Sequence, residues 1–188
     1  KTDSSGDLYK TKEKRLPLKF VLDKMLRESD NTALRVLLRY VDLEDLQFIL
    51  DYYGLDIQIR NEESEDLVSP KSISTLFLSL YFSTVLEPKH SEYILSLLAD
   101  STFDIKQIAG IPEDLRIVHK FGENYYNNNR FFHDCGIMYI DEKRILYCVM
   151  TKNLDEEDGA ETVGFIINKI YDYVEQTDVL LSNYGKKS

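Results

Sequence analysis

Positions 116–123 read RIVHKFGE, and the hydrophobic pattern changes its period at this stretch. Upstream of Gly110, apolar residues recur every three to four positions, as they do on the buried face of a helix. From Arg116 onward they alternate every second position, as in a half-buried strand. A helical region is therefore followed by a small sheet, which indicates an α+β fold.

Three strands are expected in the second half of the chain, at 116–121, 132–140 and 145–151. A short charged turn joins the second strand to the third. The Asn- and Tyr-rich segment 123–130 is expected to be the loop between the first two strands. An amphipathic helix at about 160–174 follows. The sequence thus predicts an antiparallel three-strand meander and a C-terminal helix.

The helical region is expected to contain several amphipathic helices that begin at recognisable capping residues. The first runs from Leu18 to about Leu26, and Asp42 and Ser69 are placed as the N-caps of later helices, Ser69 with proline directly after it. A further helix is expected at about 91–99. The acidic segment 61–66 is expected to be an exposed loop.

Length, composition and charge limit the class of protein. The chain has 188 residues, 43% of them hydrophobic and 12% aromatic, which is enough for one globular domain and excludes wholesale disorder. The net charge of -10 argues against nucleic acid as a partner. The apolar runs are too short for a transmembrane segment.

The expected layout is a flexible tail at 1–15, a single domain at 16–176 and a second tail at 177–188. Within the domain, the helical part covers about 16–110, and the sheet with the C-terminal helix covers about 111–176. The first residue is Lys1, not Met, so we expect the chain to be trimmed from something longer.

Cys135 and Cys148 are the two cysteines, and both fall on the strands of the predicted hairpin. A register that places them opposite each other would allow a cross-strand disulfide. Free buried cysteine is the commoner state and is the favoured interpretation.

Two short motifs carry polar residues that could do chemistry. The first is Ser29-Asp30-Asn31, between two helices, and the second is Lys120-Phe121-Gly122, at the end of the first strand. Taken alone, each has an ordinary structural explanation. Ser, Asp and Asn are common helix caps, and lysine on an edge strand followed by a turn glycine is also common.

Together, and in this order, the motifs resemble the second and third motifs of the penicillin-recognising serine hydrolases, the class A β-lactamases and penicillin-binding proteins. Ser29 lies 91 residues before Lys120, a separation that spans the helical half. The resemblance extends over about 16–176 and implies a β-lactamase/transpeptidase-like fold whose N-terminal strands are missing here.

The resemblance implies two catalytic residues in this chain. Ser29 would relay a proton toward the leaving nitrogen, and Lys120 would add positive charge beside it and bind a substrate carboxylate. In the family a serine with a lysine one helical turn later attacks an amide carbonyl to form an acyl-enzyme.

The resemblance also implies a set of substrate-binding residues. Asn31 would donate its side-chain amide to the substrate, Gly122 would let substrate lie against the strand, and the backbone N–H of Glu123 would be an oxyanion donor. Phe121 stands where the usual motif has a hydroxyl, which puts a hydrogen bond to the substrate carboxylate in doubt.

The sequence departs from the family at the nucleophile. No serine here is followed three residues later by lysine, so no residue of this chain is predicted as the nucleophile. The residues Glu62, Glu63 and Glu65 do not form the Glu-x-x-Leu-Asn pattern of class A deacylation. An upstream Ser-x-x-Lys segment, roughly 50 to 60 residues before Ser29, is therefore expected in an active protein.

Three hypotheses follow. The leading one is a serine hydrolase that acts on β-lactam or peptidoglycan stem-peptide amide bonds, of which this chain alone is inactive. The second is a catalytically degenerate binding or interaction module of the same fold. The third is an unrelated α+β domain in which both motifs occur by chance.

The expected partners follow from the leading hypothesis. They are a β-lactam or stem peptide, with a missing N-terminal segment or a second chain that completes the sheet. No cofactor and no metal are expected, because His133, Asp134 and Cys135 alternate between the faces of a strand. His119 is expected to be packed rather than catalytic. A location in the cell envelope is implied by the resemblance alone.

Overall fold

The computed structural model describes residues 6–55, 57, 68–126, 129–154 and 156–185. The chain forms two compact units, Lys1–Phe103 and Asp104–Ser188. In the described residues, the first unit is helical, and the second contains a sheet with two helices. The order of elements confirms the predicted α+β fold, in which helices precede a meander and a C-terminal helix.

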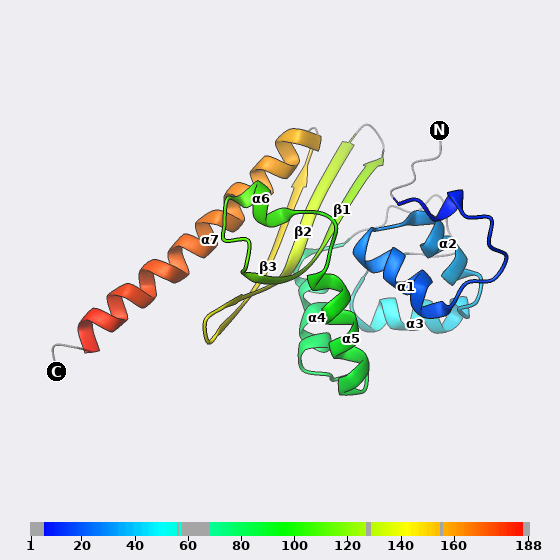
Figure 1. The fold of residues 1–188 in the computed structure, drawn as a ribbon, viewed down its shortest axis with the longest axis horizontal. Coiled ribbons are helices and arrows are strands. Elements are labelled where there is room, and N and C mark those ends of the chain that lie inside the picture. Colours follow the sequence, from blue (N-terminus) through cyan, green and yellow to red (C-terminus); the bar gives the residue numbers. More distant parts are fainter. Residues whose placement is uncertain (1–5, 56, 58–67, 127–128, 155, 186–188) are drawn as a thin grey trace. The chain divides into compact units, whose positions relative to one another are not determined.

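The described part of the first unit consists of a 3-10 turn and α-helices. These are η1 (Leu8–Lys10), α1 (Leu18–Arg27), α2 (Asn31–Leu38), α3 (Leu43–Tyr52), α4 (Pro70–Tyr81) and α5 (Pro88–Ala99). Figure 1 shows η1, α1 and α2 gathered at one end of this unit. The end of α5 is held to the end of α1, because Arg27 pairs with Asp100 at 2.8 Å and its carbonyl oxygen accepts the Thr102 N–H at 3.0 Å.

The predicted caps are confirmed. The Asp42 carboxylate accepts the N–H of Glu44 at 2.8 Å at the start of α3. The Ser69 hydroxyl accepts the N–H of Ser72 at 3.1 Å at the start of α4, and the Ser72 hydroxyl accepts the N–H of Ser69 in return. Helix α5 begins at Pro88, earlier than the predicted start at 91, because proline suits the first helical position.

The segment 1–15, predicted as a tail, contains a packed residue. Leu8 in η1 is 4% exposed and packs with Val21 and Ala33 in a small apolar core. A single apolar side chain among charged ones has no helical period, so the pattern did not reveal it. The acidic segment 61–66 lies outside the described residues.

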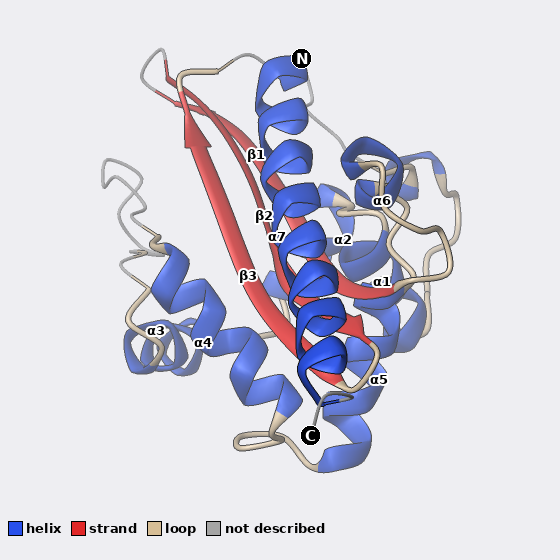
Figure 2. Cartoon of the chain, turned by 90° about the vertical axis from the view of Figure 1, so that its left-hand side faces the viewer, coloured by secondary structure: helices blue, strands red, loops and turns tan. Residues whose placement is uncertain are grey.

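The second unit consists of α6 (Ile105–Ala109), β1 (Arg116–Tyr126), β2 (Asn129–Ile140), β3 (Lys143–Lys152) and α7 (Glu156–Gly185). The sheet order is β1-β2-β3, and both strand pairs are antiparallel. Helix α7 packs against β2 and β3 and runs along one face of the sheet (Figure 2). Gly159 allows this approach, because a Cβ there would lie 2.9 Å from Cβ of Phe132.

Several boundaries differ from the prediction. The predicted loop 123–130 is largely strand, since pairing continues to Tyr126 opposite Asn129. Tyrosine favours strands, and its preference outweighs the turn signal of the asparagines. Helix α7 extends from Glu156 to Gly185, through residues predicted as tail, and the short helix α6 was not predicted.

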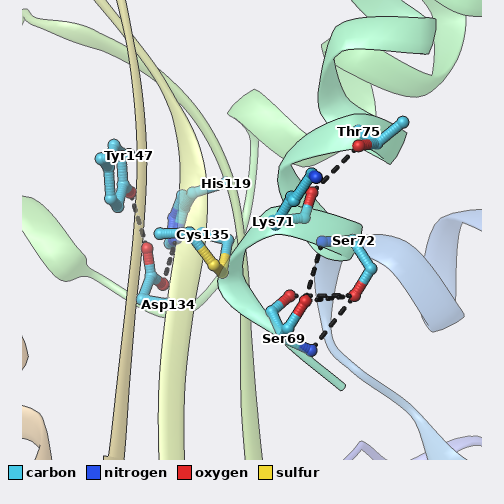
Figure 3. Close-up of a disulfide and its surroundings, with 9 residues drawn as sticks. Ser69, Lys71, Ser72, Thr75, His119, Asp134, Cys135 and Tyr147 are labelled. Atoms are coloured by element: carbon cyan, nitrogen blue, oxygen red, sulfur yellow. Dashed lines mark hydrogen bonds and ion pairs between the residues drawn. A yellow bond between two sulfur atoms is a disulfide. The ribbon is translucent and has the colours of Figure 1, made fainter. Parts of the chain in front are cut away.

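Cys135 and Cys148 form a disulfide, so the favoured interpretation of free cysteines is wrong. The two-residue turn at 141–142 sets the β2–β3 register, and this register places Cys135 directly opposite Cys148. Opposite residues of antiparallel strands point to the same face, which brings the two sulfur atoms together. Figure 3 shows the bond on the sheet.

None of the helices in the described part of the chain is both long and apolar enough to span a bilayer. The boundary between the two compact units lies after Phe103, whereas the sequence placed the end of the helical part near 110. That residues 16–176 form one domain stays a prediction.

Candidate functional site

The turn Ser29-Asp30-Asn31 joins α1 to α2 and has an uncommon backbone. Ser29 has a φ of 55°, in the left-handed region that residues with a side chain rarely adopt. The N–H of Asp30 donates to the carbonyl oxygen of Lys24 at 3.1 Å, which closes the end of α1. Backbone of this kind persists only where its surroundings hold it, and it is concentrated at functional sites.

Asp30 holds the turn from within the protein. Its side chain is 1% exposed, and one carboxylate oxygen accepts the N–H of Ala33 at 2.9 Å as the N-cap of α2. The other oxygen accepts the N–H of Leu8 at 2.8 Å, from a segment 22 residues earlier in the chain. The sequence predicted a cap in this motif, and Asp30 is the residue that provides it.

Lys24, on α1, adds a second connection to the segment at the start of η1. Its ammonium lies 2.9 Å from a carboxylate oxygen of Asp7 and 2.8 Å from one of Glu28. These two carboxylates raise the pKa of Lys24, Glu28 more than Asp7. Asp7 and Leu8, at the start of η1, are thus held by Lys24 and Asp30 respectively.

Ser29 and Asn31 flank the buried Asp30, and both are partly exposed. Asn31 is the first residue of α2, so its backbone position is set by the cap. The turn therefore carries a serine and an asparagine on a backbone held by Asp30.

The second motif lies on β1, an edge strand of the sheet. By strand alternation, Lys120 shares a face with Val118 and Gly122, as predicted. Lys120 pairs in register with Cys135, and Gly122 pairs with His133. The disulfide therefore lies on the same face as Lys120, in the same row of the sheet.

The Lys120 ammonium is largely withdrawn from water. Burial lowers its pKa to about 8, and the negative charge of Asp134 acts in the opposite direction. The ammonium donates to the carbonyl oxygen of Phe121 at 3.2 Å and lies 4.6 Å from the centre of the Phe121 ring. Lysine in such an environment can hold a proton or release it near neutral pH.

Gly122 leaves the strand surface open next to Lys120. A Cβ added there would meet no atom within 4 Å among the described residues. Phe121 and Gly122 are partly buried, and Glu123 is exposed. Space for a side-chain methyl group is therefore left unfilled beside Lys120 on β1.

We expect Lys120→Met to stabilise the protein in a pH-dependent way. Because the folded-state pKa of Lys120 is about 8 against an ordinary 10.5, burying the ammonium destabilises the fold below pH 8, and this cost fades as the pH rises toward 10.5. The variant should gain about 2 kcal/mol at pH 7 and much less at pH 10.

Urea unfolding of both proteins at pH 7, 8.5 and 10 measures this difference. Lys169→Met is the control, because Lys169 is exposed on α7 and pairs with Asp172 at 3.1 Å. An equal gain at pH 7 and pH 10 for Lys120→Met would contradict the effect of burial on Lys120.

A buried network lies on the opposite face of the same sheet. His119 Nδ1 is 2.8 Å from Oδ2 of Asp134, and the Tyr147 hydroxyl donates to Oδ1 of Asp134 at 2.6 Å (Figure 3). His119 is 4% exposed, which confirms that it is packed. The sequence did not reveal this network, since its members come from three strands and meet only in one register.

The structure brings the predicted site residues together in two groups. Ser29 and Asn31 share one turn of the first unit, and positions 120–123 share one strand of the second. Among the described residues, no group of three or more His, Cys, Asp or Glu side chains could hold a metal ion.

The model of the beta-lactamase enzyme family matches residues 1–174. Among curated proteins, no sequence matches this chain. Because the family model matches most of the chain, the third hypothesis, an unrelated domain with chance motifs, is wrong.

Solved structures of low sequence identity have the same fold. The chain is similar to a variant of the TLA-1 extended-spectrum beta-lactamase, with a TM-score of 0.78 and 17% identity over 92% of this chain and 71% of that one. It is similar to a mutant of PBP-A in its acyl-enzyme complex with penicillin G. The TM-score is 0.74 and the identity 22%, over 91% of this chain and 67% of that one. A class A beta-lactamase from Bacteroides cellulosilyticus gives a TM-score of 0.71 and 13% identity, over 90% of this chain and 70% of that one. These likenesses show a β-lactamase-like fold, of which the chain spans about two thirds.

Proposed function

Because the chain belongs to the beta-lactamase enzyme family, we propose that it carries the substrate-recognition and proton-transfer residues of a serine hydrolase acting on β-lactam or peptidoglycan stem-peptide amides. The observation that carries this proposal is the partly desolvated Lys120 beside the open surface at Gly122. A largely buried ammonium next to an unfilled strand surface is suited to hold a substrate carboxylate.

In this proposal, a serine oxygen attacks the amide carbonyl, the C–N bond breaks, and the leaving nitrogen takes a proton. Ser29 relays that proton, and the charge of Lys120 makes the transfer easier. The left-handed backbone at Ser29 supports this role, since it sets the direction of the Cα–Cβ bond that carries the hydroxyl.

Substrate binding is assigned to the residues beside these two. Asn31 donates its amide to the substrate, Gly122 accommodates the substrate chain, and the N–H of Glu123 stabilises the oxyanion. The Phe121 ring lies 4.6 Å from the Lys120 ammonium, which supports a role in holding the lysine in place of the hydroxyl contact of the family.

The nucleophile is assigned to a Ser-x-x-Lys segment outside these 188 residues, either upstream in a longer protein or on a second chain that also completes the sheet. We place the protein in the cell envelope, where stem peptides occur. The Cys135–Cys148 disulfide supports this location, because disulfides persist in oxidising compartments.

A fluorescent penicillin tests the proposal. A longer protein that contains an upstream Ser-x-x-Lys should form a stoichiometric covalent adduct, while residues 1–188 alone should form none, because the acyl bond needs the serine. An adduct on residues 1–188 would contradict the assignment of the nucleophile.

The degenerate binding module is the second candidate, and the replacement of a hydroxyl residue by Phe121 favours it. In that case the longer protein forms no adduct but competes reversibly for penicillin. This outcome would overturn the hydrolase and leave the binding role.

A further inference from the structure

A pocket of about 160 Å³ lies between α3 and α4 in the first unit, and the proposed reaction does not use it. Its lining includes Tyr52 and Tyr53 at the end of α3, and Ser79 and Phe82 at the end of α4. Figure 2 shows the two helices side by side. An engineered cavity of about 150 Å³ binds benzene, so this pocket has the size for one six-membered ring.

A hydrogen bond joins the two helices at the pocket. The Tyr53 hydroxyl donates to Oγ of Ser79 at 2.8 Å, and the Ser79 hydroxyl donates to the carbonyl oxygen of Leu76 at 2.9 Å. These bonds fix the side chains of Tyr53 and Ser79 before any ligand binds. A pocket that is formed in advance spends less binding energy on ordering its own side chains.

The turn after α4 brings a further residue to the pocket and has an uncommon backbone. Ser83 has a φ of 52°, in the left-handed region where a helix end usually has glycine. Its N–H donates to the carbonyl oxygen of Leu80 at 3.2 Å, and the N–H of Thr84 donates to that of Ser79 at 3.0 Å. The chain thus turns back, so that Thr84 lines the pocket. Left-handed backbone outside glycine is unfavourable and is concentrated at functional sites.

Two aromatic rings at the pocket are largely exposed. Tyr52 is 70% exposed and Phe82 is 67% exposed. Each ring has a perpendicular neighbour: the ring centre of Tyr53 lies 5.3 Å from that of Tyr52, and the ring centre of Tyr81 lies 5.0 Å from that of Phe82. Edge-to-face contacts of this kind hold a ring in place. The pocket therefore offers aromatic surface that is already positioned for a ligand.

The polar side chains at the pocket carry hydroxyl groups, and none of the described residues that line it is charged. The Thr75 hydroxyl donates to the carbonyl oxygen of Lys71 at 3.0 Å, so its oxygen can accept a hydrogen bond from a ligand. Thr84 brings another hydroxyl to the lining. A charged ligand would find no opposite charge in this lining, and a purely apolar one would cover hydroxyl groups without bonding to them.

A sugar ring matches these features. Its C–H faces are apolar and suit aromatic rings, its hydroxyl groups donate and accept hydrogen bonds, and a neutral hexose carries no charge. We propose that the pocket between α3 and α4 binds one neutral pyranose ring of a glycan. The C–H groups of the ring pack on Tyr52 and Phe82, and its hydroxyl groups bond to Thr75 and Thr84. This inference goes beyond the proposed function and does not rest on it.

The test is a titration of the ¹⁵N-labelled 188-residue chain with chitotetraose, a neutral oligosaccharide of N-acetylglucosamine, without any β-lactam. We expect saturable amide shifts at Tyr52, Tyr53, Ser79 and Thr84, with a dissociation constant of about 1 mM. Ligand and reporting residues both differ from those of the penicillin experiments, so either proposal can fail while the other holds.

Substitutions at the pocket test the two kinds of contact separately. Tyr52→Ala and Phe82→Ala should each weaken binding about tenfold, because each removes one aromatic face. Both side chains are largely exposed, so both variants should fold. Thr84→Val keeps the shape of the side chain but removes its hydroxyl, and it should weaken binding about threefold.

Phe48→Ala is the matched control. Phe48 is also on α3 and is 71% exposed, but it does not line the pocket, so the dissociation constant should not change. The proposal would be overturned by the absence of saturable shifts at the pocket, or by an equal loss of affinity in Phe48→Ala and Tyr52→Ala. Unaltered affinity in Thr84→Val would indicate an apolar ligand, and tighter binding of an oligogalacturonate would indicate an anionic one. Either result would also overturn the proposal.

Discussion

Asp30→Ala should lower the free energy of unfolding by about 3 kcal/mol. The substitution removes the N-cap of α2 and leaves the N–H groups of Ala33 and Leu8 without their acceptor in a buried place. The segment around η1 should loosen together with the start of α2. Chemical denaturation followed by circular dichroism measures the loss, and hydrogen exchange at the Leu8 and Ala33 amides locates it.

Asp42→Ala is the matched control, since Asp42 is also an aspartate N-cap and accepts the N–H of Glu44 at 2.8 Å. Its cap is exposed, so water replaces the lost acceptor and the expected loss is about 1 kcal/mol. Equal losses in both variants would contradict the conclusion that Asp30 joins the N-terminal segment to the turn.

Gly136→Ala should destabilise the sheet by about 3 kcal/mol. The new methyl group would overlap the carbonyl oxygen of Val118, which is backbone and cannot turn aside as a flexible side chain does. Strand β1 would have to move away from β2, and the contact between His119 and Asp134 would lengthen. The loss is measured by urea denaturation, and the strand movement by the amide shifts of residues 117–121.

Gly122→Ala serves as the control on the same sheet. A Cβ there meets no described atom within 4 Å, so the free energy of unfolding should change by only about 0.5 kcal/mol or less. If Gly136→Ala proved as mild as Gly122→Ala, the close approach of β1 to β2 at Gly136 would be wrong.

The starts of α3 and α4 could be predicted from the sequence because their signals are local. Asp42 and Ser69 cap α3 and α4 as expected, since a capping side chain bonds to N–H groups two or three residues away. The predicted start of α5 at 91 was wrong, although the proline at its first helical position, Pro88, is a local signal of the same kind.

The lengths of the strands and of α7 could not be predicted with the same success. Tyr125 and Tyr126 extend β1 because β2 offers a partner, and that partner is a property of the hairpin rather than of the segment. Cys148 likewise meets Cys135 only because the turn at 141–142 sets the register. Register is a long-range property that composition does not reveal.

In the candidate site, too, some residues have local signals in the sequence and others are defined only by long-range contacts. Ser29, Asn31 and Lys120 were predicted from short motifs, and their roles remain a proposal. Asp30 stands in a polar stretch of sequence, and Asp134 is a charged residue on a strand, so neither could be recognised as buried before folding encloses it. Their roles follow from contacts to Leu8 and Tyr147, which lie 22 and 13 residues away in the chain.

The most direct test of the central claim, that both motifs take part in β-lactam binding, is a titration of the ¹⁵N-labelled chain with benzylpenicillin. We predict saturable amide shifts at Ser29 and Asn31 and at positions 120–123, with the same dissociation constant for both groups, and their loss in Lys120→Met. Shifts confined to one motif, shifts only at other residues, or no shifts at saturating ligand would contradict the account.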